Sequence, residues 1–375
     1  MRSMIHNMRE SFAATEACHH GGRIRKIASG LGVDQNDLLD FSANINPLGS
    51  PPLEDLIEQE MKKVCHYPDN DYTEFRKAAA KFVGVDPENI VPGNGSSELF
   101  RLFAEAIVED GDKVVIPIPT FGEYETQAKL FGAKIVHVQA GIHRPSDPDE
   151  FLDESLLEDA KAVFFCNPNN PTGALLSRKR VVKLAMRCER AETFLLVDEA
   201  FIELSDPDQS VAQMAPHMEY LFVTRSLTKS FGVPGLRLGF GVAGDQMAKV
   251  MNQTRLPWSI GSLTAACGTY LLGELDHLER SREKIGVELS WLTGELKRLG
   301  LNPVKSTVNF ILVETGHTGL SSTEIEEMMV AEKVLVRNCR SFPGLGEDYI
   351  RVAVRDREEN EQLVEALGSV LGCRD

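Results

Sequence analysis

Between about residues 75 and 245, short apolar runs alternate with amphipathic segments. Six of these runs are predicted to be buried strands because they are four or five residues long and lie between helical patterns. They are Lys113–Pro117, Lys134–Val138, Ala162–Cys166, Thr193–Val197, Leu221–Thr224 and Leu238–Val242. This alternation predicts an α/β fold in which helices cover both faces of a mostly parallel sheet.

The segment that follows Gly95 carries apolar residues at helical spacing. The predicted stripe consists of Leu99, Leu102, Phe103, Ala106 and Ile107, which follow the 3.6-residue period. We therefore expect a helix that opens directly after the glycine and packs this stripe against the sheet.

Beyond Pro257 the pattern changes. A long charged helix is predicted over roughly residues 274–299, with shorter helices near 321–332 and 358–371. Strands are expected at Asn309–Val313, Val334–Arg337 and Tyr349–Val354. We predict three parts: an N-terminal segment (1–47) that packs with the small domain and the active site, a large domain (48–258) and a small C-terminal α+β domain (259–375).

Composition excludes several classes of partner. The chain of 375 residues is 42% hydrophobic, carries a net charge of -16 and has a pI near 5.1. It has no basic excess to replace counterions on phosphates, so we expect neither a nucleic-acid partner nor an anionic membrane. Residues 1–17 lack the apolar run of a signal peptide, and no segment is long and apolar enough to span a membrane.

The seven cysteines include no CxxC pair. Such a scattered, odd number is typical of reduced thiols, so we expect a soluble cytoplasmic protein without disulfides. The adjacent Cys18, His19 and His20 could suggest zinc, but neighbouring residues rarely converge on one ion. No metal site is predicted.

One lysine has the surroundings of a reactive amine. Lys229 follows the hydroxyl residue Ser226 and precedes Arg237 in a glycine-rich, apolar stretch. Loss of solvation disfavours the ammonium form, and the arginine suggests a neighbouring anion. A Schiff-base lysine beside a cofactor phosphate would explain both features, whereas the alternative is a surface lysine in a turn.

A second segment can bind an anion. The sequence from Gly93 to Glu98 opens the predicted helix, so unpaired N–H groups and the hydroxyls of Ser96 and Ser97 would face outward. An ordinary N-cap would also explain this segment. Arg237 and Ser226 would supply the missing charge and a further hydroxyl.

Two strand ends carry polar residues. The segment from Asn167 to Gly173, which includes Asn170, leaves a buried strand and turns sharply at its prolines. Asp198 ends the strand after it, at the edge where α/β proteins bind ligands, and can pair with a cationic ring nitrogen. The GxGxxG match from Gly239 to Gly244 lies within a predicted strand, so we do not interpret it as a dinucleotide site.

Taken in order, Asn167–Gly173, Asp198–Phe201 and Ser226–Gly239 resemble the signature of the fold-type I, pyridoxal-phosphate-dependent aminotransferase superfamily, and the resemblance extends over nearly the whole chain. It implies a mostly parallel seven-stranded sheet plus the smaller α+β domain, with pyridoxal 5'-phosphate as cofactor. It also implies that Lys229 forms the Schiff base, Asp198 pairs with the ring nitrogen, Asn170 bonds the ring hydroxyl and Phe121 stacks on the ring.

The same resemblance implies that the cofactor phosphate is held by Gly95, Ser96, Ser97, Ser226 and Arg237. Tyr67 would reach the cofactor of a neighbouring subunit in a homodimer with a shared active site. Phe201 stands where the superfamily usually has a tyrosine that bonds the ring oxygen.

Within the superfamily, the chain is most similar to the branch that contains histidinol-phosphate aminotransferases and threonine-phosphate decarboxylases. In that branch Arg351 would clamp the substrate carboxylate, with Ala43 and Asn44 beside it. A substrate phosphate would be held by some of His20, Arg23, Arg25 and Arg337.

The resemblance therefore implies decarboxylation of L-threonine O-3-phosphate to (R)-1-amino-2-propanol O-2-phosphate for cobalamin biosynthesis. The segments His20–Arg25, Asp40–Gly49, Leu256–Ser259 and Val334–Leu345 favour this reaction. The alternatives are an aminotransferase that acts on histidinol phosphate, a decarboxylase of L-serine O-phosphate and a non-catalytic protein that has kept the fold.

Overall fold

The structure, a computed structural model, describes residues 9–18, 21–143 and 147–372. Its main sheet has seven strands: β2 (Ile90–Gly93), β3 (Lys113–Ile118), β4 (Lys134–Gln139), β5 (Ala162–Cys166), β6 (Phe194–Asp198), β7 (Leu221–Ser226) and β8 (Gly239–Ala243). Their order is β2-β8-β7-β6-β5-β3-β4, and β8 runs antiparallel to both of its neighbours. The predicted α/β fold with a mostly parallel seven-stranded sheet is confirmed.

All six strands predicted from apolar runs occur in this sheet, but the prediction missed β2. This strand has only four residues and contains Pro92 and Gly93, two residue types that are rare within strands. β2 lies at the edge of the sheet and pairs only with β8, where a proline is tolerated.

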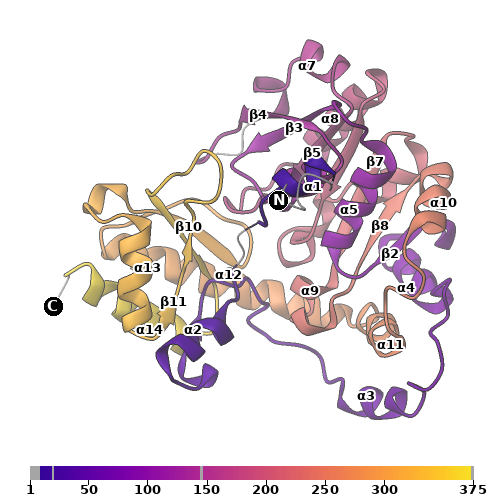
Figure 1. The fold of residues 1–375 in the computed structure, drawn as a ribbon. Coiled ribbons are helices and arrows are strands. Elements are labelled where there is room, and N and C mark those ends of the chain that lie inside the picture. Colours follow the sequence, from indigo (N-terminus) through magenta and orange to yellow (C-terminus); the bar gives the residue numbers. More distant parts are fainter. Residues whose placement is uncertain (1–8, 19–20, 144–146, 373–375) are drawn as a thin grey trace, which may run out of the picture.

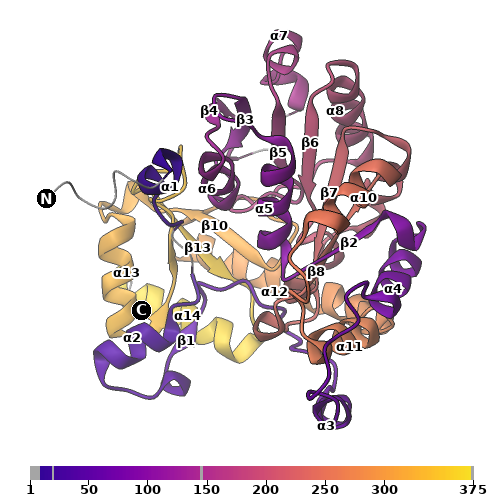
Figure 2. The same cartoon turned by 45° about the vertical axis from the view of Figure 1, so that its right-hand side comes forward.

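Helices cover both faces of the main sheet (Figures 1 and 2). On one face lie α5 (Ser96–Ile107), α6 (Glu123–Leu130) and α10 (Asp245–Thr254). On the other face lie α4 (Thr73–Val83), α7 (Glu154–Glu158), α8 (Arg178–Arg190) and α11 (Ser262–Leu271). Side chains alternate between the two cores along each strand, as with Phe164 on one face and Phe165 on the other.

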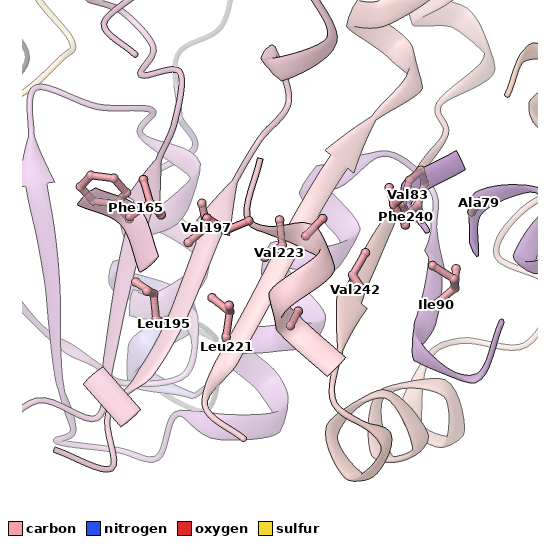
Figure 3. Packing of buried hydrophobic residues seen from close by; sticks show 14 of the residues in the cluster. Ala79, Val83, Ile90, Phe165, Leu195, Val197, Leu221, Val223, Phe240 and Val242 are labelled. Atoms are coloured by element: carbon pink, nitrogen blue, oxygen red, sulfur yellow. The ribbon is translucent and has the colours of Figure 1, made fainter. Parts of the chain in front are cut away.

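The second of these cores is drawn in Figure 3. Leu195, Val197 and Val223 project from β6 and β7, and residues of α4 pack at the far end of the row. Each fully buried side chain of this size contributes roughly 1.5–3 kcal/mol to folding.

The stripe predicted for α5 is only partly right. Leu99, Leu102, Phe103 and Ile107 are buried, but Ala106 is exposed. Phe100 is buried in addition, because α5 also packs against α6, where the Phe100 ring lies 5.1 Å from that of Tyr124.

The C-terminal region forms a smaller α+β unit, shown in orange and yellow in Figure 1. Its antiparallel sheet has the order β12 (Arg337–Asn338), β13 (Tyr349–Ala353), β10 (Phe310–Glu314) and β9 (Asn302–Pro303). Its helices are α12 (Leu275–Arg298), α13 (Ser322–Ala331) and α14 (Arg357–Val370). The elements predicted after Pro257 are therefore present, and the boundaries at 47 and 258 stay predictions.

The strand predicted over Val334–Arg337 is divided between two sheets. Its first half is β11 (Val334–Leu335), which pairs in parallel with β1 (Leu39–Asp40), and its second half is β12. Pairing with β1, together with α2 (Ile24–Leu31), joins the N-terminal region to the C-terminal unit.

The remaining helices are α1 (Glu10–Ala14), α3 (Glu54–Met61) and α9 (Leu227–Ser230). α1 lies against α6, where Ser11 donates to the Leu130 carbonyl and the Phe12 and Phe131 rings meet edge to face. Within the described ranges, no helix combines the length and the apolar character that a membrane span requires.

Candidate active site

A cavity of about 310 Å³ lies at the carboxyl ends of β5, β6 and β7. This is the edge at which open α/β sheets bind ligands. The opposite wall comes from β12, β13 and the N-terminal region. Residues of the predicted site that line the cavity are Ala43, Asn44, Ser96, Ser97, Phe121, Asn170, Asp198, Phe201, Ser226, Lys229, Arg237, Arg337 and Arg351.

Lys229 lies on the short helix α9, directly after β7. Burial, together with the positive charges of Arg351 and Arg237, lowers the pKa of its amine from the usual 10.5 to about 8. The lysine therefore holds a substantial fraction of neutral, nucleophilic amine near neutral pH.

Asp198 ends β6 and is 4% exposed. Its Oδ1 accepts hydrogen bonds from Thr224 Oγ1 at 3.0 Å and from the Ala200 N–H at 3.1 Å. Tyr124 donates to Oδ2 at 2.6 Å. Burial raises the pKa of Asp198 to about 6, although the bonds from Tyr124 and Thr224 oppose this rise. The carboxylate is therefore largely ionised at neutral pH and can hold a cationic ring nitrogen.

An anion cradle lies where α5 begins. Ser226 pairs with Gly239 across β7 and β8, and Gly239 pairs in turn with Gly93 of β2, so the start of α5 lies beside Ser226. Arg237 directly precedes β8 and lines the same cavity. Free N–H groups at the helix N-terminus, serine hydroxyls and a guanidinium together form a donor set suited to a phosphate.

Gly95 does not line the cavity but makes room for the cradle. Its φ is +76° and its ψ is 166°, a region that is essentially restricted to glycine. A Cβ at this position would lie 2.5 Å from Arg237 Nη2. Gly95 therefore allows the guanidinium to lie against the backbone at the start of α5.

Replacing Gly95 by alanine is expected to weaken cofactor phosphate binding at least tenfold, because the methyl group displaces Arg237 and the backbone strain costs about 1–3 kcal/mol. Equilibrium binding of pyridoxal 5'-phosphate to the cofactor-free protein measures this. Gly286→Ala is the matched control, since a Cβ there meets no atom within 4 Å. Equal affinities in the two variants would contradict the role of Gly95.

Arg351 and Arg337 form the wall opposite Lys229. They are directly paired on the antiparallel strands β13 and β12 and are 6% and 7% exposed. Arg351 donates to Asn170 Oδ1 and to the Ser42 carbonyl, the latter at 3.1 Å. Arg337 donates to Ser341 Oγ at 2.8 Å. Burial lowers the pKa of Arg351 to about 10, and both side chains remain cationic at neutral pH.

Three buried polar atoms at the cavity find no hydrogen-bond partner among the described residues. They are Asn44 Oδ1, Thr228 Oγ1 and Arg351 Nε. Buried polar groups are rarely left unpaired, and those at functional sites are often completed by a ligand. These atoms indicate that the cavity binds a polar molecule.

Phe201 contacts this wall through Phe310. Its ring lies 5.1 Å from the Phe310 ring, and the Arg351 guanidinium lies over the Phe310 ring, 5.1 Å from its centroid. Because phenylalanine has no hydroxyl, Phe201 contributes packing here and no hydrogen bond.

The structure does not bring every predicted site residue into the cavity. Tyr67 is 81% exposed and packs against Trp258, with ring centroids 4.7 Å apart. Arg23 lies in a small neighbouring pocket that it shares with Arg337, and its guanidinium is 3.9 Å from Glu326. Arg25 is exposed on α2. His20 lies outside the described residues.

Several lining residues were missed by sequence reasoning: Gly21, Thr228 and Phe342. Gly21 approaches Ser42 so closely that a Cβ would lie 2.3 Å from the Ser42 carbonyl oxygen. Thr228 could have been identified from the sequence, because it immediately precedes Lys229. Phe342 lies in the turn that follows β12, and the Arg337 guanidinium lies 5.4 Å from the centroid of its ring. Its segment was part of the resemblance, but no role was predicted for this side chain.

A buried charge network supports the helix that carries Lys229. Arg225 lies between Glu199, at 2.9 Å, and Glu203, and all three side chains are almost fully buried. Glu203 also accepts a hydrogen bond from Ser230 at 3.1 Å, next to Lys229. Asn46 donates to the Ser230 carbonyl at 2.7 Å, so α9 is held from two sides.

The GxGxxG match has a packing role. Gly239 and Gly241 lie in strand β8, and a Cβ on Gly241 would lie 2.2 Å from the Phe222 ring. Gly241 therefore lets the aromatic core approach the strand, whereas a Cβ on Gly239 would lie 2.5 Å from the Arg225 carbonyl oxygen.

Comparisons with known proteins identify the family of the chain. The family model for aminotransferase class I and II matches residues 36–367. The chain belongs to this family. It is 30% identical to histidinol-phosphate aminotransferase from Methanothermobacter thermautotrophicus, over 94% of both chains. It is 32% identical to threonine-phosphate decarboxylase from Salmonella typhimurium, over 94% of this chain and 96% of the relative.

Among solved structures, the fold of this aminotransferase class I and II member is similar to that of histidinol-phosphate aminotransferase from Sinorhizobium meliloti in complex with pyridoxal-5'-phosphate. The TM-score is 0.88, with 22% identity and full coverage of both chains. Membership of the family indicates pyridoxal 5'-phosphate as the cofactor of this chain. The donor set described above fits that molecule: an anion cradle, a carboxylate for the ring nitrogen and a lysine of lowered pKa.

Proposed function

We propose that this enzyme decarboxylates L-threonine O-3-phosphate to (R)-1-amino-2-propanol O-2-phosphate. The observation that carries the proposal is the pair of buried arginines, Arg337 and Arg351, which lie side by side in the cavity wall. Two desolvated guanidinium groups favour a substrate with two anionic groups. An O-phospho amino acid presents a carboxylate and a phosphate in one molecule, whereas histidinol phosphate has no carboxylate.

Each arginine suits one of these groups. Arg351 lies between Asn170 and the Ser42 carbonyl, where it can bind the carboxylate near Asn44. Arg337 lies toward the pocket that contains Arg23, so a second guanidinium can approach the same phosphate. A phosphate held there draws the substrate side chain toward the N-terminal region.

The bound cofactor supplies a sink for the electron pair released at Cα. In the proposed reaction the bond from Cα to the carboxylate carbon breaks and CO2 leaves. Lys229 then donates a proton from Nζ to Cα, and Asp198 remains ionised beside the ring nitrogen throughout. Which Cα bond breaks depends on how the two arginines orient the substrate.

Transamination of histidinol phosphate is the second candidate. The same arginine pair can bind the two carboxylates of a dicarboxylic amino-group donor or acceptor, and relatives of both names match the chain. We also propose a homodimer in which Tyr67 reaches the neighbouring subunit, since its ring is exposed and does not line the cavity of its own chain.

Incubation of the cofactor-loaded protein with L-threonine O-3-phosphate, without a keto acid, tests the proposal. We expect CO2 and the phosphorylated amino alcohol over many turnovers. L-serine O-phosphate should react with a kcat/KM about 10–200-fold lower, because a pocket distinguishes one methyl group by only about 1–3 kcal/mol. Amino transfer from histidinol phosphate to 2-oxoglutarate without CO2 release would instead assign the protein to the aminotransferases.

A further inference from the structure

Tyr124 lies behind the cavity, in contact with the carboxylate of Asp198. It belongs to α6 and is fully buried. Its hydroxyl donates to Asp198 Oδ2 at 2.6 Å. Tyr124 does not itself line the cavity, so it acts on a bound molecule only through its neighbours.

The hydroxyl completes a three-donor arrangement around Asp198. Oδ1 accepts two hydrogen bonds, from Thr224 and the Ala200 N–H, and Oδ2 accepts one from Tyr124. A carboxylate oxygen can accept about two hydrogen bonds. Oδ2 therefore keeps one acceptor position for a donor in the cavity.

An aromatic cage fixes the position of the Tyr124 ring. The rings of Phe100 and Phe121 meet it edge to face at 5.1 and 5.7 Å, and the Phe164 ring stacks on it at 5.7 Å. Phe121 also lines the cavity. Tyr124 thus joins the side chain expected to stack on the cofactor ring to the carboxylate expected to bind its nitrogen.

We propose that Tyr124 is a positioning residue that keeps Asp198 ionised and directed at the ring nitrogen of the cofactor. This inference rests on the proposed role of Asp198 and is independent of which substrate the enzyme uses. The ring nitrogen must be protonated to draw electrons from the substrate, so the hydrogen bond from Tyr124 would contribute to every reaction at this site.

The groups around Asp198 show in which direction loss of the Tyr124 hydroxyl would change the pKa of this carboxyl group. Titratable groups that face it are Tyr124 on α6, Cys166 on β5, the adjacent Glu199 and Lys229 on α9. Burial raises the pKa of Asp198 to about 6, and the Tyr124 hydroxyl opposes this rise. Burial and Asp198 hold the pKa of Tyr124 well above 10, so its hydroxyl stays protonated. Without that hydroxyl, the pKa of Asp198 moves toward neutrality.

Tyr124→Phe keeps the ring and removes only the hydroxyl. We expect the affinity of the cofactor-free protein for pyridoxal 5'-phosphate to fall roughly tenfold at pH 7, the usual effect of losing a hydrogen bond to a charged group. Because Asp198 regains its charge at higher pH, the loss should shrink to less than about threefold at pH 9. The visible absorption of the loaded variant should show a matching shift with pH.

Tyr72→Phe is the matched control. Tyr72 is also buried, and its hydroxyl bonds the backbone of Ile260 away from the cavity. We expect the Tyr72→Phe variant to be less stable but to show no pH-dependent change in cofactor affinity. In an Asp198→Asn background, Tyr124→Phe should cause no further pH-dependent loss.

A loss of affinity in Tyr124→Phe that is the same at pH 7 and pH 9, or no loss at all, would overturn the proposal. If that variant does not fold, 3-fluorotyrosine at position 124 retains the ring and is a stronger donor, so it should increase affinity at pH 7. An unchanged affinity would then overturn the proposal. No substrate is present in these measurements, so their outcome is separate from that of the decarboxylation assay.

Discussion

Lys229→Ala is expected to lower turnover roughly 10⁴-fold or more, a loss typical of removing a covalent nucleophile. Two proposed functions of the amine should be lost together: binding of the cofactor and transfer of the proton to Cα. The visible absorption of the purified protein should disappear as well. Absorption spectra and CO2 release measure the two losses separately.

The pH dependence of Lys229 adds a second test of the same residue. With a pKa of about 8, roughly a tenth of the amine is neutral at pH 7, compared with about one part in 3,000 at the ordinary pKa of 10.5. Labelling of the cofactor-free protein by an amine-reactive reagent should therefore rise with pH around a midpoint near 8 at this residue. Lys249, exposed on α10, is the control for the alanine substitution and for the labelling experiment. Equal labelling of the two lysines at pH 7 would contradict a lowered pKa.

Arg337→Met is expected to lower kcat/KM for L-threonine O-3-phosphate about 10²- to 10³-fold, because it would leave the buried substrate phosphate without the cation proposed to bind it. For L-threonine, which lacks the phosphate, the change should be less than about threefold. Steady-state kinetics with both substrates separates recognition of the phosphate from a general loss of structure.

Arg340→Met is the control for Arg337. Arg340 lies three residues further along the chain, and its exposed side chain pairs only loosely with Glu347 at 3.5 Å. Its replacement should leave kcat/KM unchanged for both L-threonine O-3-phosphate and L-threonine. If Arg337→Met lowers kcat/KM equally for L-threonine and for L-threonine O-3-phosphate, the arginine supports the fold of the site without binding the phosphate.

Much of the site could be predicted because its chemistry is local in the sequence. Lys229, Asp198 and Asn170 each follow a short apolar run, and the ends of neighbouring parallel strands must meet at one edge of the sheet. The alternation of strands and helices determined the fold class in the same way. Among the strands of the main sheet, β2 lacked a sufficient signal because it is a short edge strand with proline and glycine.

Other features depend on contacts between distant segments. Tyr124 and Asp198 are 74 residues apart, and their hydrogen bond exists because α6 packs against the face of the sheet on which the Asp198 carboxylate lies. Arg337 and Arg351 become neighbours only through the register of β12 and β13. A local pattern does not encode that register.

The sequence by itself thus determined the fold class, since hydrophobic periodicity acts over a few residues, and its resemblance to a known family implied the cofactor and the residues expected to hold it. Tertiary structure decided how those residues are tuned. Burial lowers the pKa of Lys229, hydrogen bonding from Tyr124 limits the pKa rise of Asp198, and strand pairing places two arginines in one wall. Each of these depends on desolvation and on distances that only the packed chain defines.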